Sequence, residues 1–272
     1  MRDPGSSGVS AATGCELHYA DGTRVVDYLM DGGLHLAGYS PPAVVRAVES
    51  VPAGSARDGE PPGAGALGFG WPCRTYADAD VALAAAEKHV GTAACEPFDA
   101  ELVDAGIFES EVVDMRRGWG RVDPGHAWRL VVLGASAAAG HDFGAVLARD
   151  ATDLPEAGAP TSPKALAAAA AVNDLAGGVA VAQTSGRAER LAYGLAELAQ
   201  ASGVRVRPVQ PGGMFRLVFD DSREAERFAA EMFARGIRVP ADGIWWPSFA
   251  HDYFTIESTV DAAAAAFVAT CE

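Results

Sequence analysis

The sequence predicts an α/β fold that ends in a compact α+β unit. Two observations predict it. Short apolar runs of the kind found in buried strands, such as Arg129–Gly134, share the chain with long stretches of helical spacing, such as Gly186–Ser202. Residues 205–271 then place strands and helices in close succession. Because 49% of the 272 residues are hydrophobic, the chain has enough apolar material for a substantial core.

The first elements are a hairpin and a helix, after a flexible lead-in over residues 1–13. Glu16–Leu29 contains two short alternating runs on either side of Asp21-Gly22, a dipeptide that tolerates the positive φ of tight turns. Pro42–Ser50 carries valines at helical spacing. We therefore expect a β-hairpin followed by a helix.

The middle of the chain predicts alternating helices and strands. Residues 52–66 are dense in Gly, Pro and Ala and predict a loop. Asp78–Val90 has aspartates in its first turn and basic residues in its last, which suits the helix dipole. Ala145–Ala148 predicts a second short strand after Arg129–Gly134. Pro163–Leu175 begins with proline, the favoured first residue of a helix.

The C-terminal region predicts an α+β unit. Its amphipathic helix, Ser222–Arg235, is followed by Gly236, which suits the end of a helix. The other predicted elements are three strands and a terminal helix: Arg205–Gln210, Met214–Phe219, Ile237–Pro240 and Thr259–Cys271.

The composition indicates a soluble protein of the cytoplasm. The net charge of -15 argues against nucleic acid and against anionic membranes as partners, because both carry phosphate. The four cysteines are scattered without the paired spacing of zinc sites, so we expect reduced thiols and no metal. No charged-then-apolar leader opens the chain, and its apolar runs are too short to span a bilayer.

Several motifs resemble class III aminotransferases, a family of enzymes that use pyridoxal phosphate (PLP), and most closely their glutamate-1-semialdehyde aminomutase branch. The segment Ala20–Val48 is similar to the family's opening "DGxxYxDY … xLGHxHPxVxxAV". Farther on, three stretches resemble "GSMF", "RGVxxPP" and "SxAH" in the family's order and spacing: Gly212–Phe219, Arg235–Pro240 and Ser248–His251.

The resemblance implies the fold-type I architecture of PLP enzymes. The chain is short for this family, so we expect a reduced remnant of the large domain joined to an intact α+β C-terminal domain. The expected boundaries are an N-terminal segment at 1–50, the remnant at 51–175 and the C-terminal domain at 176–272. The family builds its site between two copies of the chain, which implies a homodimer.

The family's catalytic residues are missing at the matching positions. Leu133-Gly-Ala-Ser136 resembles the family's "LGK", so Ala135 stands where the lysine forms its Schiff base with PLP. The aspartate that keeps the pyridinium nitrogen protonated falls on Val113 or, with a shift of one residue, on Asp114. The threonine that holds the phosphate falls near Gly158. The resemblance therefore implies no bound cofactor and no transaminase activity.

Two pairs of polar residues are candidate acid–base groups. Asp31 and His35 lie four residues apart where the family lines its substrate cleft, and a carboxylate can orient an imidazole that titrates near neutrality. His141 and Asp142 follow the segment that carries the lysine in the family. The alternative is that Asp31 and His35 are turn residues facing water, and that only one of His141 and Asp142 reaches the site.

Five further residues are candidates for substrate binding. Trp245 and Trp246 would wall a pocket, although a core or dimer-contact role explains them equally well. Arg116, Arg117 and Arg121 would bind a carboxylate with two parallel hydrogen bonds, and the alternative is a solvated charge cluster. His251, which matches a family motif, is expected to be structural.

These observations leave two classes of function open. The first is a PLP-independent enzyme of specialised, natural-product biosynthesis. It would carry out acid–base chemistry, such as cyclisation, dehydration, isomerisation or hydrolysis, on an amino- or keto-bearing small molecule. The second is a catalytically inactive aminotransferase-like protein that acts as a partner or regulator. A third possibility is a transaminase that binds PLP without a covalent bond.

Overall fold

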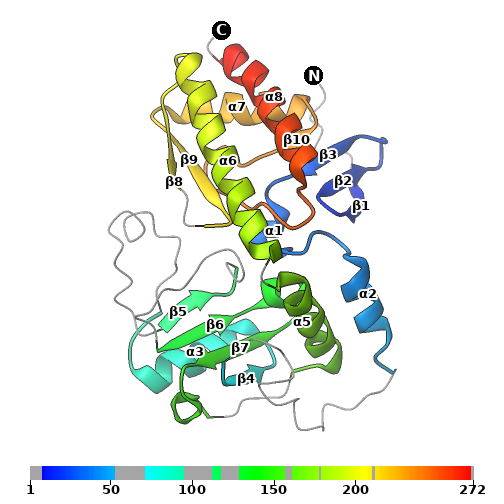
Figure 1. Ribbon diagram of the computed structural model, residues 1–272, viewed down its shortest axis with the longest axis vertical. Helices are drawn as coiled ribbons and strands as arrows, with labels where there is room; N and C mark the ends of the chain where they lie inside the picture. Colours follow the sequence, from blue (N-terminus) through cyan, green and yellow to red (C-terminus); the bar gives the residue numbers. More distant parts are fainter. Residues whose placement is uncertain are drawn as a thin grey trace. The chain divides into compact units, whose positions relative to one another are not determined.

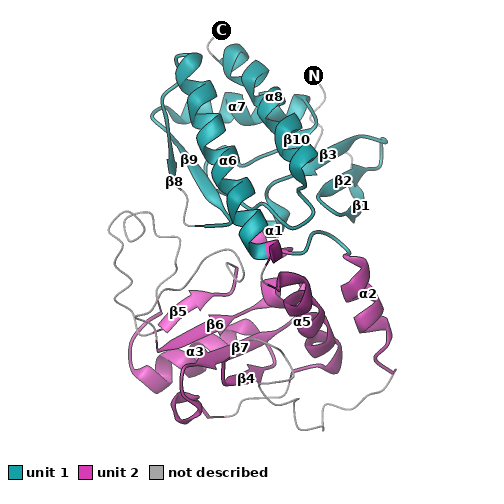
Figure 2. Ribbon diagram, viewed as in Figure 1, with its two compact units in different colours: residues 1–32, 37–40, 181–272 teal, residues 33–36, 41–180 magenta. Residues whose placement is uncertain are grey.

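The computed structural model describes residues 8–52, 71–94, 112–117, 129–156, 161–177, 179–209 and 212–270. The chain divides into two compact units (Figure 2). Unit 1 comprises residues 1–32, 37–40 and 181–272, and unit 2 comprises residues 33–36 and 41–180. The expected N-terminal segment is therefore split between the two units, and its hairpin joins the C-terminal region rather than standing alone.

A four-stranded sheet explains why the hairpin belongs to unit 1 (Figure 1). Its order is β1 (Val9–Thr13), β2 (Glu16–Tyr19), β3 (Arg24–Asp27) and β10 (Ile237–Arg238). The predicted hairpin is confirmed as β2 and β3, which pair antiparallel. The C-terminal strand β10 pairs in parallel with β3, and this pairing brings the two ends of the sequence together. Where a flexible lead-in was expected, β1 pairs antiparallel with β2.

The second sheet of unit 1 confirms the predicted C-terminal α+β arrangement. Its order is β11 (Ile244–Trp245), β9 (Phe215–Phe219) and β8 (Val206–Val209), and all its pairs are antiparallel. The helices of the unit are α6 (Val179–Ala201), α7 (Ser222–Ala234) and α8 (Tyr253–Thr270). Both α6 and α8 begin earlier than predicted. Asp252 explains the start of α8, because its Oδ1 accepts a hydrogen bond from the N–H of Thr255 at 2.9 Å.

Aromatic side chains fill the core of unit 1. The rings of Phe228 and Phe267 stack with their centroids 4.2 Å apart. The ring of Trp245 stacks on Phe215 at 5.0 Å and contacts Tyr28 at 5.2 Å. All five side chains are buried. Burial of one such side chain contributes roughly 1.5–3 kcal/mol, so this cluster is a main source of the stability of unit 1.

Unit 2 is built on a four-stranded sheet whose order is β4 (Cys73–Tyr76), β7 (Gly144–Ala148), β6 (Leu130–Leu133) and β5 (Val112–Met115). The strands β5 and β6 are parallel, and the other pairs are antiparallel. Every residue of β5, β6 and β7 is buried, which explains the continuous apolar runs that predicted β6 and β7. The strands β4 and β5 lie outside the elements that the sequence pattern predicts.

Helices complete unit 2. They are α2 (Pro42–Glu49), α3 (Ala79–Val90), α5 (Pro163–Ala176) and the 3-10 turns η3 (Ala135–Ala138) and η4 (Ala151–Asp153). The three predicted α-helices of this region are confirmed. Asp78 caps α3 by accepting from the N–H of Val81 at 2.9 Å, and Gly91 ends it with a left-handed φ of 82°. The helix α3 packs on the sheet face that carries Tyr76, Val132 and Val146.

A four-residue segment, α1 (Met30–Gly33), follows β3 and has an unusual backbone. Met30, Asp31 and Gly32 have φ values of 44°, 53° and 65°, so the chain makes a left-handed turn through two residues with side chains. Such a conformation costs roughly 1–2 kcal/mol per residue. The surrounding structure must therefore hold the turn in this conformation. The turn carries Asp31, one of the candidate acid–base residues.

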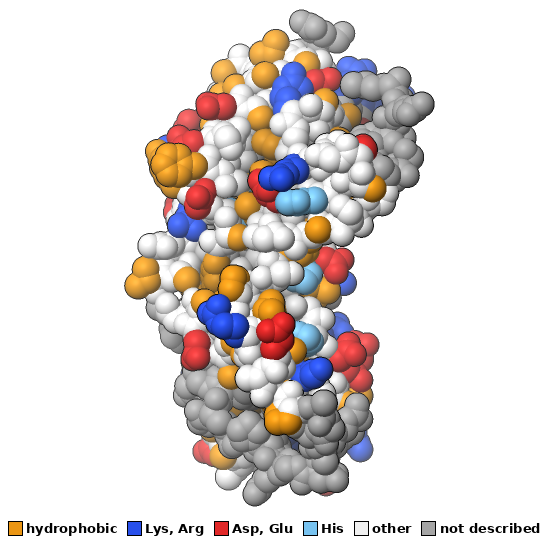
Figure 3. Space-filling view, turned by 90° about the vertical axis from the view of Figure 1, so that its right-hand side faces the viewer, with side chains coloured by type: hydrophobic (Ala, Val, Ile, Leu, Met, Phe, Trp, Pro, Cys, Tyr) orange, Lys and Arg blue, Asp and Glu red, His pale blue; other side chains and the backbone are white. Residues whose placement is uncertain are grey.

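Charged side chains of both signs share the described surface (Figure 3). On the described part of the face in Figure 3, acidic and basic side chains are interspersed and form no broad basic patch. Within the described ranges, no single helix is long and apolar enough to cross a membrane, although α5 and α6 taken together as a bent pair pass that test of length and composition.

Candidate functional site

One edge of the sheet of unit 2 brings together the segments that carry Ala135, Arg117, His141 and Asp142. Because β5 and β6 are parallel, their last residues Met115 and Leu133 lie side by side. The antiparallel strands β7 and β4 add the first residue of β7, Gly144, and the last residue of β4, Tyr76, to the same edge. We call this the strand-end edge of unit 2.

A buried ion pair lies at this edge. The carboxylate of Asp114, near the end of β5, is 7% exposed and contacts the guanidinium of Arg116. Arg116 Nε lies 3.0 Å from Oδ1 and 2.9 Å from Oδ2, and Nη2 lies 2.8 Å from Oδ2. Arg116 Nη1 also contacts Asp80 of α3 at 2.5 Å. One guanidinium therefore binds two carboxylates, and the charge of Asp114 is neutralised within the protein.

Close backbone contacts hold the segments at this edge against one another. The hydroxyl of Ser136 donates to the carbonyl oxygen of Arg116 at 2.8 Å. A Cβ placed on Gly134 would lie 2.9 Å from the Cβ of Arg116, and one placed on Gly144 would lie 1.9 Å from the carbonyl oxygen of Asp78. Since no side chain fits at either glycine, the chain packs tightly just beyond the strand ends.

The position expected to lack the Schiff-base lysine lies at this edge. Ala135 begins η3, directly after β6 and Gly134. The chain has two lysines, Lys88 and Lys164, and both are exposed. Lys88 lies in the last turn of α3 and Lys164 in the first turn of α5. Neither lysine is a buried amine beside the strand ends.

The structure brings His35 next to the segment that carries His141 and Asp142. Both Ala139 and Gly140 have left-handed φ values, of 51° and 87°. A Cβ on Gly140 would lie 3.0 Å from Cε1 of the His35 ring, so the imidazole lies against the backbone of this residue. His141 follows directly and is half-buried, whereas Asp142 is exposed. Of the predicted acid–base residues, His35 and the 141–142 segment are therefore neighbours within unit 2.

Asp31 lies in unit 1, at the exposed tip of the left-handed turn. The expected pairing of Asp31 with His35 stays a prediction. The turn itself is held by Asp27, which accepts hydrogen bonds from the N–H groups of Leu29 and Met30, both at 3.1 Å. The hydroxyl of Tyr39 donates to the same carboxylate at 2.6 Å.

Asp27 is a residue that the sequence analysis missed. It is fully buried, and the guanidinium of Arg238 lies 3.4 Å from its Oδ1. Burial raises the pKa of Tyr39 above that of a free phenol, and its hydrogen bond to Asp27 raises the pKa further. One signal could have identified Asp27: strand alternation places it on the same face as the buried Val25.

The two tryptophans lie in the interior of unit 1. Trp245 is 1% exposed and belongs to the aromatic core. Trp246 is 5% exposed, and its backbone N–H donates to the carbonyl oxygen of Tyr28 at 2.8 Å. This burial favours the core role that the sequence left open over substrate binding. His251 is also fully buried, and its Nδ1 accepts from the N–H of Ser248 at 3.0 Å, which fits the structural role expected for it.

The remaining candidates are placed in part. Arg117 is exposed at the strand-end edge, directly after Arg116. Arg121 lies outside the described residues, and so does Gly158, the position expected for the phosphate threonine. In the described ranges, no group of three His, Cys, Asp or Glu side chains lies close enough to hold a metal ion.

The fold of the chain matches that of known aminotransferases. A transaminase with PLP bound matches with a TM-score of 0.78 and 15% identity over 97% of this chain and 91% of that chain. An omega-transaminase from Sphaerobacter thermophilus matches with a TM-score of 0.78 and 13% identity over 98% and 92%. For an N-acetylornithine aminotransferase from Stenotrophomonas maltophilia K279a, the TM-score is 0.74 with 16% identity over 98% and 96%. No protein-family model and no curated protein sequence matches this chain.

These identities show the fold alone. The expected α/β aminotransferase fold is confirmed. The matches extend over most of each neighbour, and the expected shortening of the large domain stays a prediction.

Proposed function

We propose that this protein is an aminotransferase-fold enzyme that works without a covalently bound cofactor. Its substrate would be an amino- or keto-bearing small molecule, and its reaction a proton transfer of the kind that drives cyclisation, dehydration, isomerisation or hydrolysis. A role in specialised biosynthesis and a homodimeric assembly belong to the same proposal. The observation that carries it is the state of the lysines: both are exposed at helix ends, and Ala135 begins η3.

The residues at the strand-end edge do not fit PLP. A Schiff base needs a lysine amine beside the cofactor, and the methyl group of Ala135 cannot supply one. Both oxygens of the Asp114 carboxylate already contact Arg116, so a protonated ring would have to compete with the guanidinium for them. The proposed reaction therefore does not involve this cofactor.

The chemistry of the proposed site rests on His35. Histidine is the side chain that most readily gives and takes a proton near pH 7. His35 lies against Gly140, and His141 follows at the next position. Two imidazoles on adjoining segments would act as base and acid on one bound carbonyl compound. Arg117, exposed at the same edge, would attract a carboxylate on the substrate.

Proton exchange in D₂O tests this proposal without knowledge of the product. The purified protein is incubated in D₂O with 2-oxo acids, amino ketones and amino acids. Proton NMR follows the loss of signals from hydrogens on carbons next to a carbonyl or carboxyl group. We expect exchange of at least one compound at a rate that falls about 10²-fold or more in His35→Gln. Equal rates for the wild type, His35→Gln and buffer would contradict the proposal.

A spectral titration tests the absence of covalent PLP. We expect the spectrum of the protein with added PLP to equal the sum of the two separate spectra. An absorbance band in the imine region that disappears on borohydride treatment, with the label recovered on Lys88 or Lys164, would contradict this expectation. Lys88→Arg and Lys164→Arg variants distinguish a specific imine from random modification of surface amines.

The ion pair of Asp114, Arg116 and Asp80 favours a second candidate, a catalytically inactive partner or regulator. At the strand-end edge, the charged side chains of the protein already pair with one another. Such an arrangement is expected in a chain that has kept the fold and lost the catalytic activity. This candidate predicts no exchange with any compound. It also predicts that the protein changes the activity of an aminotransferase encoded beside it when the two are mixed.

A further inference from the structure

A tight turn in unit 1, formed by residues 248–251, is closed on a buried imidazole. The side chain of His251 is fully buried. Its Nδ1 accepts from the backbone N–H of Ser248 at 3.0 Å and lies 2.9 Å from the hydroxyl oxygen of the same residue. The backbone N–H of His251 donates in return to the carbonyl oxygen of Ser248 at 3.1 Å. We call residues 248–251 the His251 turn.

These hydrogen bonds fix the protonation state of the imidazole. A backbone N–H can only donate, so Nδ1 of His251 must offer a lone pair, and the ring is neutral with its proton on Nε2. A second proton, on Nδ1, would set two donors against each other across 3.0 Å. It would also place a charge in the interior, where burial strongly disfavours charged groups. The closed turn therefore excludes the charged form of His251.

The ionisable groups of the neighbouring elements keep their charge between pH 5 and pH 8. The guanidinium of Arg187, on α6, donates to the carbonyl oxygen of His251 at 3.1 Å and stays positive. The ring of Tyr28, directly after β3, lies 4.3 Å from the imidazole, and burial raises the pKa of its phenol. Burial also raises the pKa of Cys15, before β2, to about 11. Hydrogen bonds at the start of α8 lower the pKa of Asp252. Of these groups, His251 is therefore the one whose charge changes near neutral pH.

The His251 turn covers a contact between two distant segments of unit 1. A Cβ placed on Gly38 would lie 2.8 Å from the Cβ of Ala250, and one placed on Gly14 would lie 3.8 Å from it. Ala250 therefore lies against both backbones. At the same place, Gly14 and Tyr39 exchange two backbone hydrogen bonds, of 2.9 and 2.6 Å. The turn thus lies over the bridge that joins the segment before β2 to residues 37–40.

We propose that the His251 turn is a pH-sensitive latch on this bridge. The latch is closed while the imidazole is neutral, and when the ring takes up a proton it leaves the interior and the turn opens. An exposed imidazole is half protonated at about pH 6.5. Because only the open turn accepts the proton, the closed turn is most stable above this pH and loses stability as the pH falls below it. The open fraction therefore rises about tenfold between pH 7.5 and pH 5.5.

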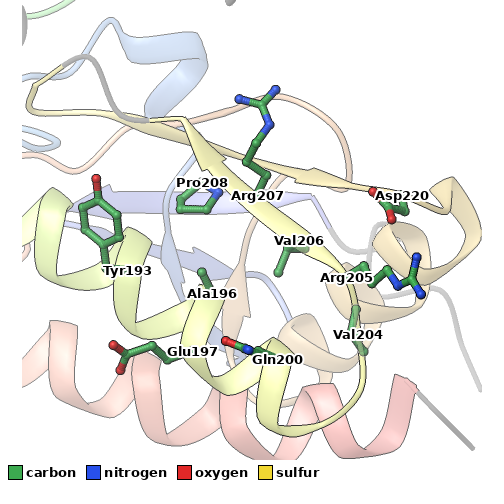
Figure 4. Close-up of a pocket in the computed structure, with 10 residues that line it drawn as sticks. All are labelled: Tyr193, Ala196, Glu197, Gln200, Val204, Arg205, Val206, Arg207, Pro208 and Asp220. Carbon is green, nitrogen blue, oxygen red and sulfur yellow. The ribbon is translucent and has the colours of Figure 1, made fainter. Parts of the chain in front are cut away.

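Hydrogen exchange followed by mass spectrometry at pH 7.5 and pH 5.5 tests the proposal on the wild type. Labelling times are scaled for the intrinsic pH dependence of amide exchange, so the remaining differences report opening. We expect peptides that cover residues 246–256 and 37–40 to exchange about tenfold faster at pH 5.5. Peptides from the C-terminal half of α6, which lines a groove beside β8 (Figure 4), are the internal reference. That half contains no histidine and should exchange equally at both pH values.

Two variants separate His251 from other groups that titrate in acid. His251→Asn keeps an acceptor oxygen for the N–H of Ser248 but cannot ionise, so residues 246–256 should exchange at the same scaled rate at both pH values. His18→Asn removes another imidazole of unit 1, which lies 3.5 Å from the carboxylate of Glu16. This variant should keep the tenfold change. Circular dichroism spectra at pH 7.5 show that each variant is folded.

Three results would overturn the proposal. They are equal exchange of residues 246–256 in the wild type at both pH values, an equal loss of protection throughout unit 1, and the same pH dependence in His251→Asn as in the wild type. The first two results need no variant. The proposal is independent of the chemistry at the strand-end edge, because the latch and the bridge belong to unit 1.

Discussion

Each unit contains a buried carboxylate at the end of a strand, and the two carboxylates are stabilised in different ways. Asp27 in unit 1 accepts three hydrogen bonds from neutral donors, the N–H groups of Leu29 and Met30 and the hydroxyl of Tyr39. Its arginine, Arg238, is the most distant of these partners, at 3.4 Å. Asp114 in unit 2 accepts one hydrogen bond from a neutral donor, the backbone N–H of Arg116 at 3.0 Å. Its other contacts are with the guanidinium of Arg116, which lies within 3.0 Å of both of its oxygens.

The difference indicates what each carboxylate does. The donors to Asp27 come from the left-handed turn that follows β3, so Asp27 fixes the backbone of that turn. Asp114 instead pairs with the guanidinium of Arg116, which also contacts Asp80 of α3. This cluster of three charged side chains connects the end of β5 to α3 at the strand-end edge. We therefore expect Asp27 to tolerate the loss of Arg238 better than Asp114 tolerates the loss of Arg116.

The largest expected effect is that of Arg116→Ala. Removal of the guanidinium leaves the carboxylate of Asp114 buried without a counter-charge, and we expect the free energy of unfolding of unit 2 to fall by about 3–5 kcal/mol. Hydrogen exchange followed by mass spectrometry checks this, because peptides from β5 and β6 should lose protection while those from β3 should not.

Arg238→Ala is the matched variant in unit 1. Asp27 keeps its three neutral donors, so we expect a loss of about 1 kcal/mol or less at β3 and β10. If Arg238→Ala and Arg116→Ala destabilise their units equally, the proposed distinction between the two carboxylates is wrong.

The next effect in size is that of Tyr39→Phe. The change removes one hydrogen bond to a charged acceptor and leaves the ring in place, so we expect a loss of about 1.5–3 kcal/mol. The high pKa of the Tyr39 phenol provides a second readout. Between pH 9 and pH 11, an ultraviolet titration of the wild type should show one more tyrosine that resists ionisation than the titration of Tyr39→Phe. A Tyr39 that ionises with the exposed tyrosines would contradict the hydrogen bond.

Much of the fold could be predicted from the sequence because its signals are local. The turn at Asp21-Gly22 identified the hairpin β2–β3, and the aspartates and Lys88 at the two ends of α3 identified that helix. The motifs that run from Gly212 to His251 pointed to the aminotransferase fold, which the solved structures confirm. Periodicity and caps act over a few residues, so one sequence is enough to reveal them.

The polar contacts between distant segments could not be predicted, because they depend on how those segments pair in the fold. Arg116 lies in the turn after β5, and Asp80 lies in α3. Nothing in the spacing of the sequence predicts that their side chains form an ion pair. The parallel pairing of β3 with β10 likewise joins the two ends of the chain. Trp245 shows the limit for site residues: an aromatic side chain suits a pocket wall and a core equally, and only its burial decides between them.

A smaller effect is expected from Gly140→Ala. Alanine at a φ of 87° costs about 1–2 kcal/mol, and its Cβ would lie 3.0 Å from the His35 ring. We expect that loss of stability together with a shift of the His35 ring signals in an NMR spectrum. Gly91→Ala is the control in the same unit, because Gly91 has a φ of 82° and no atom within 4 Å of the added Cβ. Equal shifts in both variants would remove Gly140 as the residue that positions His35.

The smallest effect on stability is expected at a third carboxylate, that of the exposed Asp252. Asp252 accepts hydrogen bonds from the N–H and the hydroxyl of Thr255 at the start of α8, and these bonds lower its pKa below the usual 3.8. A lowered pKa in the folded state adds stability above the pKa of the unfolded chain, and that stability is lost as the pH falls through the folded pKa.

We therefore expect Asp252→Ala to cost about 1 kcal/mol at pH 7 and progressively less below pH 4. Urea unfolding followed by circular dichroism at several pH values measures the difference. Asp252→Asn keeps an acceptor oxygen for the N–H of Thr255 but cannot ionise, so its stability relative to Asp252→Ala should not change with pH. If the stability difference between Asp252→Asn and Asp252→Ala also falls in acid, another ionising group causes the pH dependence of the wild type. If that difference stays constant, the charge of Asp252 stabilises the start of α8. For the buried Asp27 and Asp114, by contrast, we expect the hydrogen-bond partners to determine the stability.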